Sequence, residues 1–281
     1  MGREETCGFS WLVGLVFPSS PLELLLWGMA GIMDQRNHGV YPPLNVLKPV
    51  TQNLWIVDGP IIWFGVPWHK MPFPNRMTGI RLACGDLLVH SPTCLTPELK
   101  ATVEKLGIPR WIVGPNRIHY WWIPEWKSAY PSTSIYLAPR IKEQAANRIN
   151  FDFSGLDYGC GYPWDSEIAT LPVRGKFMTE IEFFHYPSRT LILTDLIENF
   201  EPEKLDSLLL RWLTRLGGVQ DPDGRMPRDM RLFFSRKELR EAVQKMIQWN
   251  PERIILAHGR WYEKNGVLEL RRAFRWLLGN S

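Results

Sequence analysis

Four side chains that can bind a transition metal each follow an apolar segment of the sequence. They are His119, His185, Asp195 and His258. Histidine nitrogen and carboxylate oxygen are ligands that suit zinc, iron and manganese. A single histidine at the end of a strand is more often a hydrogen-bonded structural residue than a ligand. The joint pattern, rather than any one residue, therefore predicts a metal site.

The segments before these side chains predict the strands that position them. They are short, apolar and rich in β-forming residues, and they cover 110–113, 181–184, 191–194 and 254–257. Helical patterns alternate with them: 235–249 begins with a capping box, and 202–216 carries an apolar stripe of the kind that faces a core. Such alternation is typical of an α/β fold, in which loops at strand ends present functional side chains.

The remaining patterns complete a coarse map of the chain. Strands are predicted at 53–58, 77–82, 87–90 and 134–137, and the segment 61–74, rich in tryptophan and proline, is predicted to be a loop. A helix is predicted from the cap Thr96 to Gly107, and a terminal helix over 267–278.

The first 43 residues differ from the rest. Their apolar runs, 9–17 and 22–32, are each shorter than the roughly 18 residues of a spanning helix, and no basic start marks a secretory signal. The first residues loosely fit an N-myristoylation pattern, with Cys7 as a second acylation site. We favour a disordered tail or a mispredicted start over an anchor. We therefore expect residues 1–43 to be an N-terminal extension and residues 44–281 to form a single domain.

Composition excludes several classes of protein. Apolar residues make up 45% of the 281 residues, which excludes global disorder, and a net charge of +4 is too small to indicate nucleic-acid binding. The cysteines lack the paired spacing of a structural zinc site, so we expect buried thiols in a reducing compartment, the cytoplasm or an organelle. The sequence predicts a soluble domain without a transmembrane segment, and it leaves the oligomeric state open.

Five segments, in this order along the chain, resemble the metallo-β-lactamase superfamily. They are NLWIVDGP, RMTGIRLACGDLLVHSP, GIPRWIVGPNRIHYWWIPEW, FFHYPSRTLILTDLIENF and RIILAHG. More closely, the chain is similar to an uncharacterised branch of that superfamily, known only as a domain of unknown function. The resemblance implies a four-layer αββα sandwich, with the site at the edge where the two sheets meet.

The resemblance also implies which residues hold the metal. Where active members carry a His-x-His-x-Asp-His loop, this chain has Asn116-Arg117-Ile118-His119-Tyr120-Trp121-Trp122. His119 is then the ligand left in that loop, with Asn116 as a weak oxygen donor. The bridging aspartate of the superfamily maps onto Asp195, its last histidine onto His258, and its middle histidine lies near His185. The implied site holds one ion rather than two.

Two functions follow from this resemblance, and the sequence leaves open whether the chain is an enzyme. The first is hydrolysis of an unknown ester, thioester or phosphoester, with Asp195 and His119 as catalytic residues and one divalent ion, zinc before iron or manganese, activating water. The second is a catalytically degenerate, metal-free member that binds a small molecule, a lipid or a protein. An oxygenase or sulfur dioxygenase with one iron is a third option.

Two surface features also have open interpretations. Three interpretations are open for a group of five tryptophans: they line a pocket, they face a partner, or they pack in the core. The five are Trp63, Trp68, Trp121, Trp122 and Trp126. The segment 225–241 carries six basic and three acidic residues. This excess of positive charge either selects an anionic substrate or, as we favour, marks a solvated helix face.

Overall fold

The first sheet contains the strands that the N-terminal half predicts. The computed structural model describes residues 39–66 and 69–279, and within them seven strands pair in the order β1-β2-β3-β4-β5-β6-β7. The strands are β1 (Lys48–Thr51), β2 (Leu54–Val66), β3 (His69–Arg81), β4 (Leu87–His90), β5 (Pro109–Gly114), β6 (Ser134–Leu137) and β7 (Ser154–Gly155). The pairs from β1 to β4 are antiparallel, and those from β4 to β7 are parallel.

The second sheet has four strands in the order β11-β10-β9-β8. They are β8 (Ile168–Arg174), β9 (Thr179–His185), β10 (Thr190–Leu193) and β11 (Arg253–Leu256). The pair β10–β11 is parallel, and β8, β9 and β10 form an antiparallel meander.

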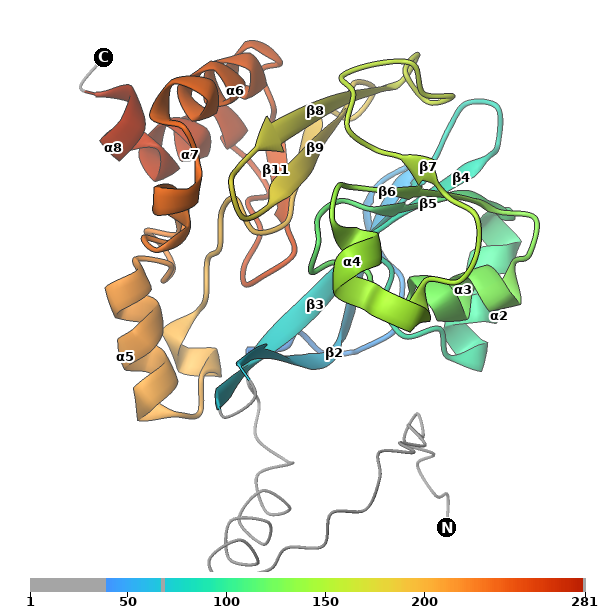
Figure 1. Ribbon diagram of the computed structural model, residues 1–281, viewed down its shortest axis with the longest axis horizontal. Helices are drawn as coiled ribbons and strands as arrows, with labels where there is room; N and C mark the ends of the chain where they lie inside the picture. The colour runs from blue at the N-terminus through green and yellow to red at the C-terminus, as the bar shows by residue number, and fades with distance from the viewer. Residues whose placement is uncertain (1–38, 67–68, 280–281) are drawn as a thin grey trace, which may run out of the picture. The chain divides into compact units, whose positions relative to one another are not determined.

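Helices cover the outer face of each sheet (Figure 1). Against the first sheet lie α2 (Pro97–Leu106), α3 (Ile123–Ala129) and α4 (Ile141–Ala145), and against the second lie α6 (Arg236–Gln248), α7 (Gly266–Ala273) and α8 (Arg275–Leu278). Short 3-10 segments occupy η1 (Ala146–Arg148), η2 (Pro202–Lys204) and η3 (Met230–Phe233). The layers are therefore helix, sheet, sheet and helix, which confirms the expected metallo-β-lactamase-type sandwich.

Alternation along the strands of the second sheet builds two apolar cores. In β9, Ile181 and Phe183 point into the core shared with the first sheet, whereas Phe184 joins the core beneath α6 to α8. In β10, Ile192 faces the first core and Leu191 the second. Since both faces of this sheet are buried, its strands read as nearly continuous apolar runs.

The prediction of a loop at 61–74 is wrong, because this segment forms the distal part of the β2–β3 hairpin. β4 pairs only with residues 78–81 of β3, so Pro72 and Pro74 lie where β3 has a neighbour on one side. A proline lacks the N–H that a central strand needs, but such an edge position tolerates it.

Two predicted helices differ in their bounds. The helix predicted over 202–216 begins instead at Leu208, as α5 (Leu208–Gly217), because Ser207 caps it by accepting from the N–H of Leu210. Of the predicted apolar stripe, Leu205 is buried just before the helix, whereas none of the ten residues of α5 is buried. The terminal helix breaks at Phe274 into α7 and α8. The capping-box helix is confirmed as α6, with Ser235 as its cap.

Residues just before β1 contact the loop that precedes α5. The N–H of Gly39 donates to the carbonyl of Lys204 at 2.9 Å, and the hydroxyl of Tyr41 donates to Glu201 at 2.5 Å. Residues 1–38 and Cys7 lie outside the described part of the chain, so the extension over 1–43 stays a prediction. None of the helices described is long and apolar enough to cross a membrane. Among the described cysteines Cys94 is buried as expected, whereas Cys84 and Cys160 are exposed.

Candidate metal centre

Three of the four predicted ligands meet at one edge of the sandwich. His119 follows β5 of the first sheet, while Asp195 and His258 follow the parallel strands β10 and β11 of the second. The N–H of Ile181 donates to the carbonyl of Pro115 at 2.9 Å, which ties the two sheets together beside these loops. The carboxyl ends of strands from both sheets thus present their side chains to one point.

The potential ligand atoms of this cluster are close enough to share one ion. The Nε2 atoms of His119 and His258 lie 3.2 Å apart, and each lies 3.2 Å from a carboxylate oxygen of Asp195. All three side chains are buried. Bonds of about 2.0–2.1 Å to a tetrahedral ion place neighbouring ligand atoms about 3.3 Å apart, so the spacing suits such an ion.

The other ring nitrogens of the two histidines are held by fixed partners. Nδ1 of His258 lies 2.7 Å from the carbonyl oxygen of Pro74, which can only accept, so this nitrogen carries a proton. Nδ1 of His119 lies 2.7 Å from Oγ of Ser91, whose hydroxyl has an acceptor in Asn75 at 3.5 Å. Both rings then direct the Nε2 lone pair at Asp195. Three converging acceptors need a cation, or a proton on one Nε2.

The three groups shift one another's pKa values. Burial alone would raise the pKa of Asp195, but interactions with the neighbouring His119 and His258 outweigh it and hold that pKa below its ordinary value. Burial lowers the pKa of His119 more than Asp195 raises it. Burial also acts to lower the pKa of His258, but the hydrogen bond and charge of Asp195 raise it overall. Without a metal, His258 is therefore the ring that holds the compensating proton.

Asn116 and Glu180 fix the orientation of Asp195. The amide nitrogen of Asn116 donates to Asp195 at 2.5 Å, and its oxygen accepts from the N–H of Ile118, so Asn116 presents a donor here and not the oxygen ligand that the sequence suggested. The carboxylate of Glu180 accepts from three successive backbone N–H groups, those of residues 194, 195 and 196, at 2.8, 3.0 and 3.2 Å. Both contacts hold the backbone and carboxylate of Asp195 in place.

A buried arginine from the opposite sheet holds the loop that carries His258. Nη1 of Arg76, in β3, donates to the carbonyls of Leu256 and Gly259 at 2.6 and 2.9 Å, on either side of His258. Its Nε donates to Asp58 at 2.8 Å. The planar guanidinium can serve all three acceptors at once, which a lysine cannot.

His185, the fourth predicted ligand, does not join the cluster. It lies at the opposite end of β9 from Glu180, five residues of extended strand away, or about 17 Å. There its Nδ1 lies 2.8 Å from Oγ of Ser188, within the turn that connects β9 and β10. The correction has a simple cause: β9 runs antiparallel to β10, so the carboxyl end of β9 points away from Asp195.

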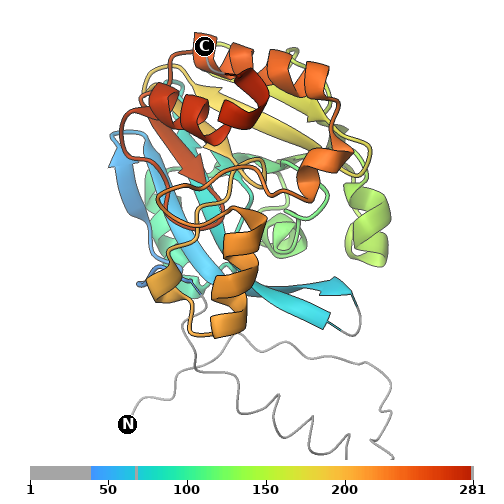
Figure 2. The same cartoon turned by 90° about the vertical axis from the view of Figure 1, so that its left-hand side faces the viewer.

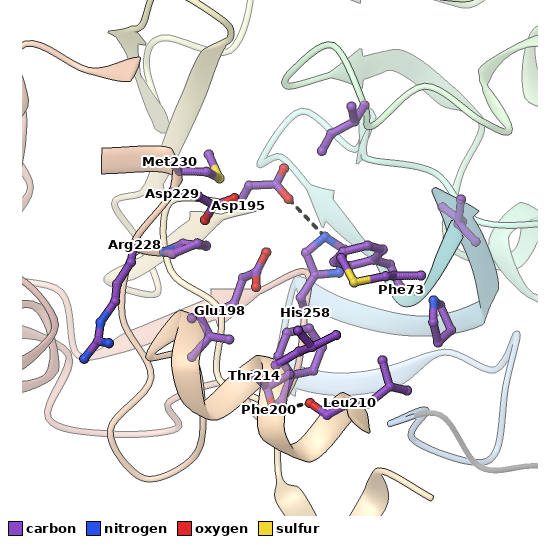
Figure 3. Close-up of a pocket in the computed structure, with 18 of the residues that line it drawn as sticks. Phe73, Asp195, Glu198, Phe200, Leu210, Thr214, Arg228, Asp229, Met230 and His258 are labelled. Atoms are coloured by element: carbon purple, nitrogen blue, oxygen red, sulfur yellow. Dashed lines mark hydrogen bonds and ion pairs between the residues drawn. The ribbon is translucent and has the colours of Figure 1, made fainter. Parts of the chain in front are cut away.

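The cluster lies in the wall of a large pocket, whose other polar lining residues include Glu198, Arg228 and Asp229. The pocket has a volume of about 670 Å³, and its lining is mostly apolar, with Phe73, Trp121 and Phe200 among the aromatic residues. Figure 3 shows Asp195 and His258 facing each other, with Glu198 beside them. Burial, together with the nearby negative charges, raises the pKa of Glu198 to about 8 despite the opposing effect of His258.

The tryptophans do not act as one group. Trp121 lines this pocket, whereas Trp122 and Trp126 are buried in the first core. Trp63 is exposed on the hairpin, and the side chain of Trp68 lies outside the described residues.

Sequence reasoning missed most residues that support the cluster. Glu180 and Glu198 carry a usable signal, since a carboxylate inside an apolar, buried segment is rarely retained without a partner or a role. Ser91 and Arg76 carry none: their contacts with the site join segments 28 and about 180 positions apart, and no local pattern shows them.

Comparison with known proteins gives a family for the chain. Residues 64–211, more than half of the chain, match the model of a family described as a domain of unknown function, DUF4336. The chain belongs to this family. The match includes His119 and Asp195 and ends before His258. No curated protein matches the chain.

Solved structures with the same fold bear out the fold that the sequence predicts. The metallo-β-lactamase DIM-1 superposes with a TM-score of 0.55 at 12% identity, over 83% of this chain and 95% of its own. The Flv1 flavodiiron core of Synechocystis sp. PCC6803 gives 0.56 at 11% identity, over 83% of this chain and 60% of its own. FIM-1 of Pseudomonas aeruginosa, in its mono-zinc form, gives 0.50 at 11% identity, over 83% and 96%. This member of DUF4336 therefore has a metallo-β-lactamase fold.

Proposed function

We propose that this DUF4336 protein is a hydrolase that uses one divalent metal ion, held by His119, Asp195 and His258. The observation that carries the proposal is the convergence of two Nε2 atoms and one carboxylate in a buried site, with both Nδ1 atoms engaged elsewhere. Two histidines, one carboxylate and an open position are a ligand set of catalytic zinc sites, and non-haem iron uses the same types.

The residues around the cluster suit hydrolysis of an ester, thioester or phosphoester. A divalent ion bound there supplies Lewis acidity and lowers the pKa of water. Asn116 and Glu180 hold Asp195 in one orientation, while Ser91 and the carbonyl of Pro74 hold the ring protons on Nδ1. Glu198 lines the same pocket wall, and when it is ionised, above its raised pKa of about 8, it can accept the proton of the attacking water.

The pocket indicates the kind of substrate that reaches this site. Its apolar and aromatic lining continues from the cluster to α5, where Leu210, Leu213 and Thr214 close one wall. Apolar surface of this extent favours a substrate with a hydrophobic group, such as an acyl chain, placed next to the bond that is cleaved.

Hydrolysis of synthetic esters tests the proposal. The purified protein, loaded with zinc, iron or manganese, is assayed with 4-nitrophenyl esters of increasing acyl length and with bis(4-nitrophenyl) phosphate. We expect metal-dependent turnover that rises with acyl length, is lost in His258→Ala, and persists in His185→Ala. Turnover that a chelator or His258→Ala leaves unchanged would contradict the proposal.

A binding module without catalysis is the second candidate, and the pocket itself favours it. A cavity of about 670 Å³ with few polar groups can hold an apolar ligand without any reaction. This alternative predicts ligand binding that is unaffected by metal removal, together with no turnover of any ester in the same assay.

A further inference from the structure

Helix α5 has apolar side chains on two faces. Its inner face lines the pocket through Leu210, Leu213 and Gly217. Its outer face carries four large apolar side chains, Leu208, Leu209, Trp212 and Leu216, which are 79%, 55%, 57% and 48% exposed. We call these four residues the α5 patch. A helix that belonged only to the domain would turn polar residues outward, so the patch points to a partner.

Arginines border the α5 patch, together with two exposed acids, Asp206 just before the helix cap and Asp229 next to Arg228. Arg211 and Arg215 lie on the helix, which contains no acidic residue. At its C-terminal end Arg228 approaches Gly218, and its backbone N–H donates to the carbonyl of Gly217 at 3.2 Å. Among the described residues, neither Arg215 nor Arg228 forms an ion pair, and both are exposed. Both guanidinium groups are thus available to an anionic partner.

The pocket opens beside the same helix. Leu216 belongs both to the α5 patch and to the pocket lining. Phe177 and Phe233 also line the pocket and are exposed, and their rings pack 5.4 Å apart. Figures 1 and 2 show α5 standing apart from the layer formed by α6, α7 and α8. The rim of the pocket is therefore apolar and continuous with the patch.

We propose that the α5 patch docks on an anionic lipid surface, with Leu208, Leu209 and Trp212 inserted at the interface and Arg215 and Arg228 facing lipid phosphates. Leucine and tryptophan on one side of a short helix, bordered by arginine, are the chemistry of an interfacial helix, and negatively charged headgroups complement it. Docking in this orientation opens the pocket toward the bilayer. The proposal concerns a surface separate from the metal ligands, so it stands or fails independently of the hydrolase proposal.

Vesicle flotation with the full chain tests this surface. The vesicles are either pure phosphatidylcholine or phosphatidylcholine mixed with phosphatidylglycerol. The double variant Leu208→Ser/Trp212→Ser removes the two most exposed residues of the patch, neither of which lines the pocket. Its matched control is Ile108→Ser/Leu268→Ser, whose residues are 67% and 64% exposed on other elements. Arg215→Glu tests the charge.

We expect the parent chain to bind the anionic vesicles. Binding should fall at least about tenfold in the double variant and in Arg215→Glu, and the control pair should bind as the parent does. Leu208, Trp212 and Arg215 are all exposed, so the melting temperature and metal content of these variants should not change. Both quantities serve as the check on folding. Absence of binding to anionic vesicles overturns the proposal. It is equally overturned if the double variant binds as the parent does, or if the patch instead drives a concentration-dependent self-association without lipid.

Discussion

Nε2 of His119 and Nε2 of His258 lie 3.2 Å apart, although 139 positions separate the two residues in the sequence. One ring comes from the first sheet and the other from the second, so only the closed sandwich brings them together. Two such nitrogens at this distance repel unless a proton or a cation lies between them and Asp195.

Removing the partner of the His119 ring should weaken metal binding. Ser91→Ala deletes the oxygen that lies 2.7 Å from Nδ1 of His119, which leaves the ring free to rotate or to change its tautomer. Loss of such a partner typically costs about 10–100-fold in metal affinity. Competition with a fluorescent zinc chelator measures the effect.

The chain offers a matched control for this change. Ser188 lies 2.8 Å from Nδ1 of His185 in the same type of contact, but at the opposite end of β9. Ser188→Ala should leave zinc affinity unchanged. If both serine variants weakened zinc binding equally, the assignment of His119 and the exclusion of His185 would both be unsupported.

Arg76→Lys should also weaken metal binding while largely preserving the fold. Lysine keeps a positive charge beside Asp58, but it cannot reach the carbonyls of Leu256 and Gly259 together, so the loop of His258 loosens. We expect at least about a tenfold loss of zinc affinity. Arg81→Lys is the control, because Arg81 lies on the same strand and donates to Asn53 rather than to the loop of His258. Equal affinities in the two variants would count against a role for Arg76.

The strands and the three clustered side chains were within reach of sequence reasoning, because each of the three follows an apolar run or the loop after it. His119, Asp195 and His258 follow parallel strands or their loops at one edge. His185 follows an equally apolar run, and what separates it from the others is strand direction, which periodicity does not encode. Strand direction is set by pairing between distant segments. Only the structure could therefore show that His185 lies away from the other three residues.

The stability of the metal-free protein should depend on pH through Glu198. Burial raises the folded-state pKa of this carboxyl from 4.5 to about 8, so the folded state binds its proton more tightly than the unfolded state does. Its contribution to stability is complete below pH 4.5 and is lost as the pH rises toward 8. The loss is on the order of 4 kcal/mol at pH 8 by proton linkage.

Glu198→Gln should remove this dependence. In the presence of a chelator, the variant should match the parent chain near pH 4.5 and unfold at a higher denaturant concentration at pH 8. Glu203→Gln, which changes an exposed carboxylate nearby, serves as the control. Parallel pH profiles for the parent and Glu198→Gln would show that Glu198 titrates normally in the folded protein.

Shortening the chain should separate the N-terminal extension from the domain. A chain that begins at Met33 should melt at the temperature of the full chain, because it keeps the contacts of Gly39 with Lys204 and of Tyr41 with Glu201. A chain that begins at Leu44 loses both, and we expect a loss of roughly 1–3 kcal/mol. Tyr41→Phe in the longer chain should reproduce the part of this stability loss that comes from the hydrogen bond of the Tyr41 hydroxyl. Equal melting temperatures for all the chains would place the domain boundary at residue 44.

Helix α5 shows where periodicity misleads. The spacing of its leucines is the spacing of a buried stripe, and a sequence pattern cannot tell a face covered by the chain itself from one left open to a partner. Leu208 and Trp212 are exposed because α5, which begins at Leu208, stands away from the second sheet. The same pattern therefore predicts the helix correctly and its environment wrongly.

The most direct test of the metal site is the metal content of the purified full chain and of three single variants, measured by inductively coupled plasma mass spectrometry. We predict one zinc, iron or manganese ion per chain, lost in Asp195→Ala and in His258→Ala and retained in His185→Ala. A chain that takes up well under one equivalent of each metal after reconstitution would contradict the account, as would a variant His185→Ala that releases the ion.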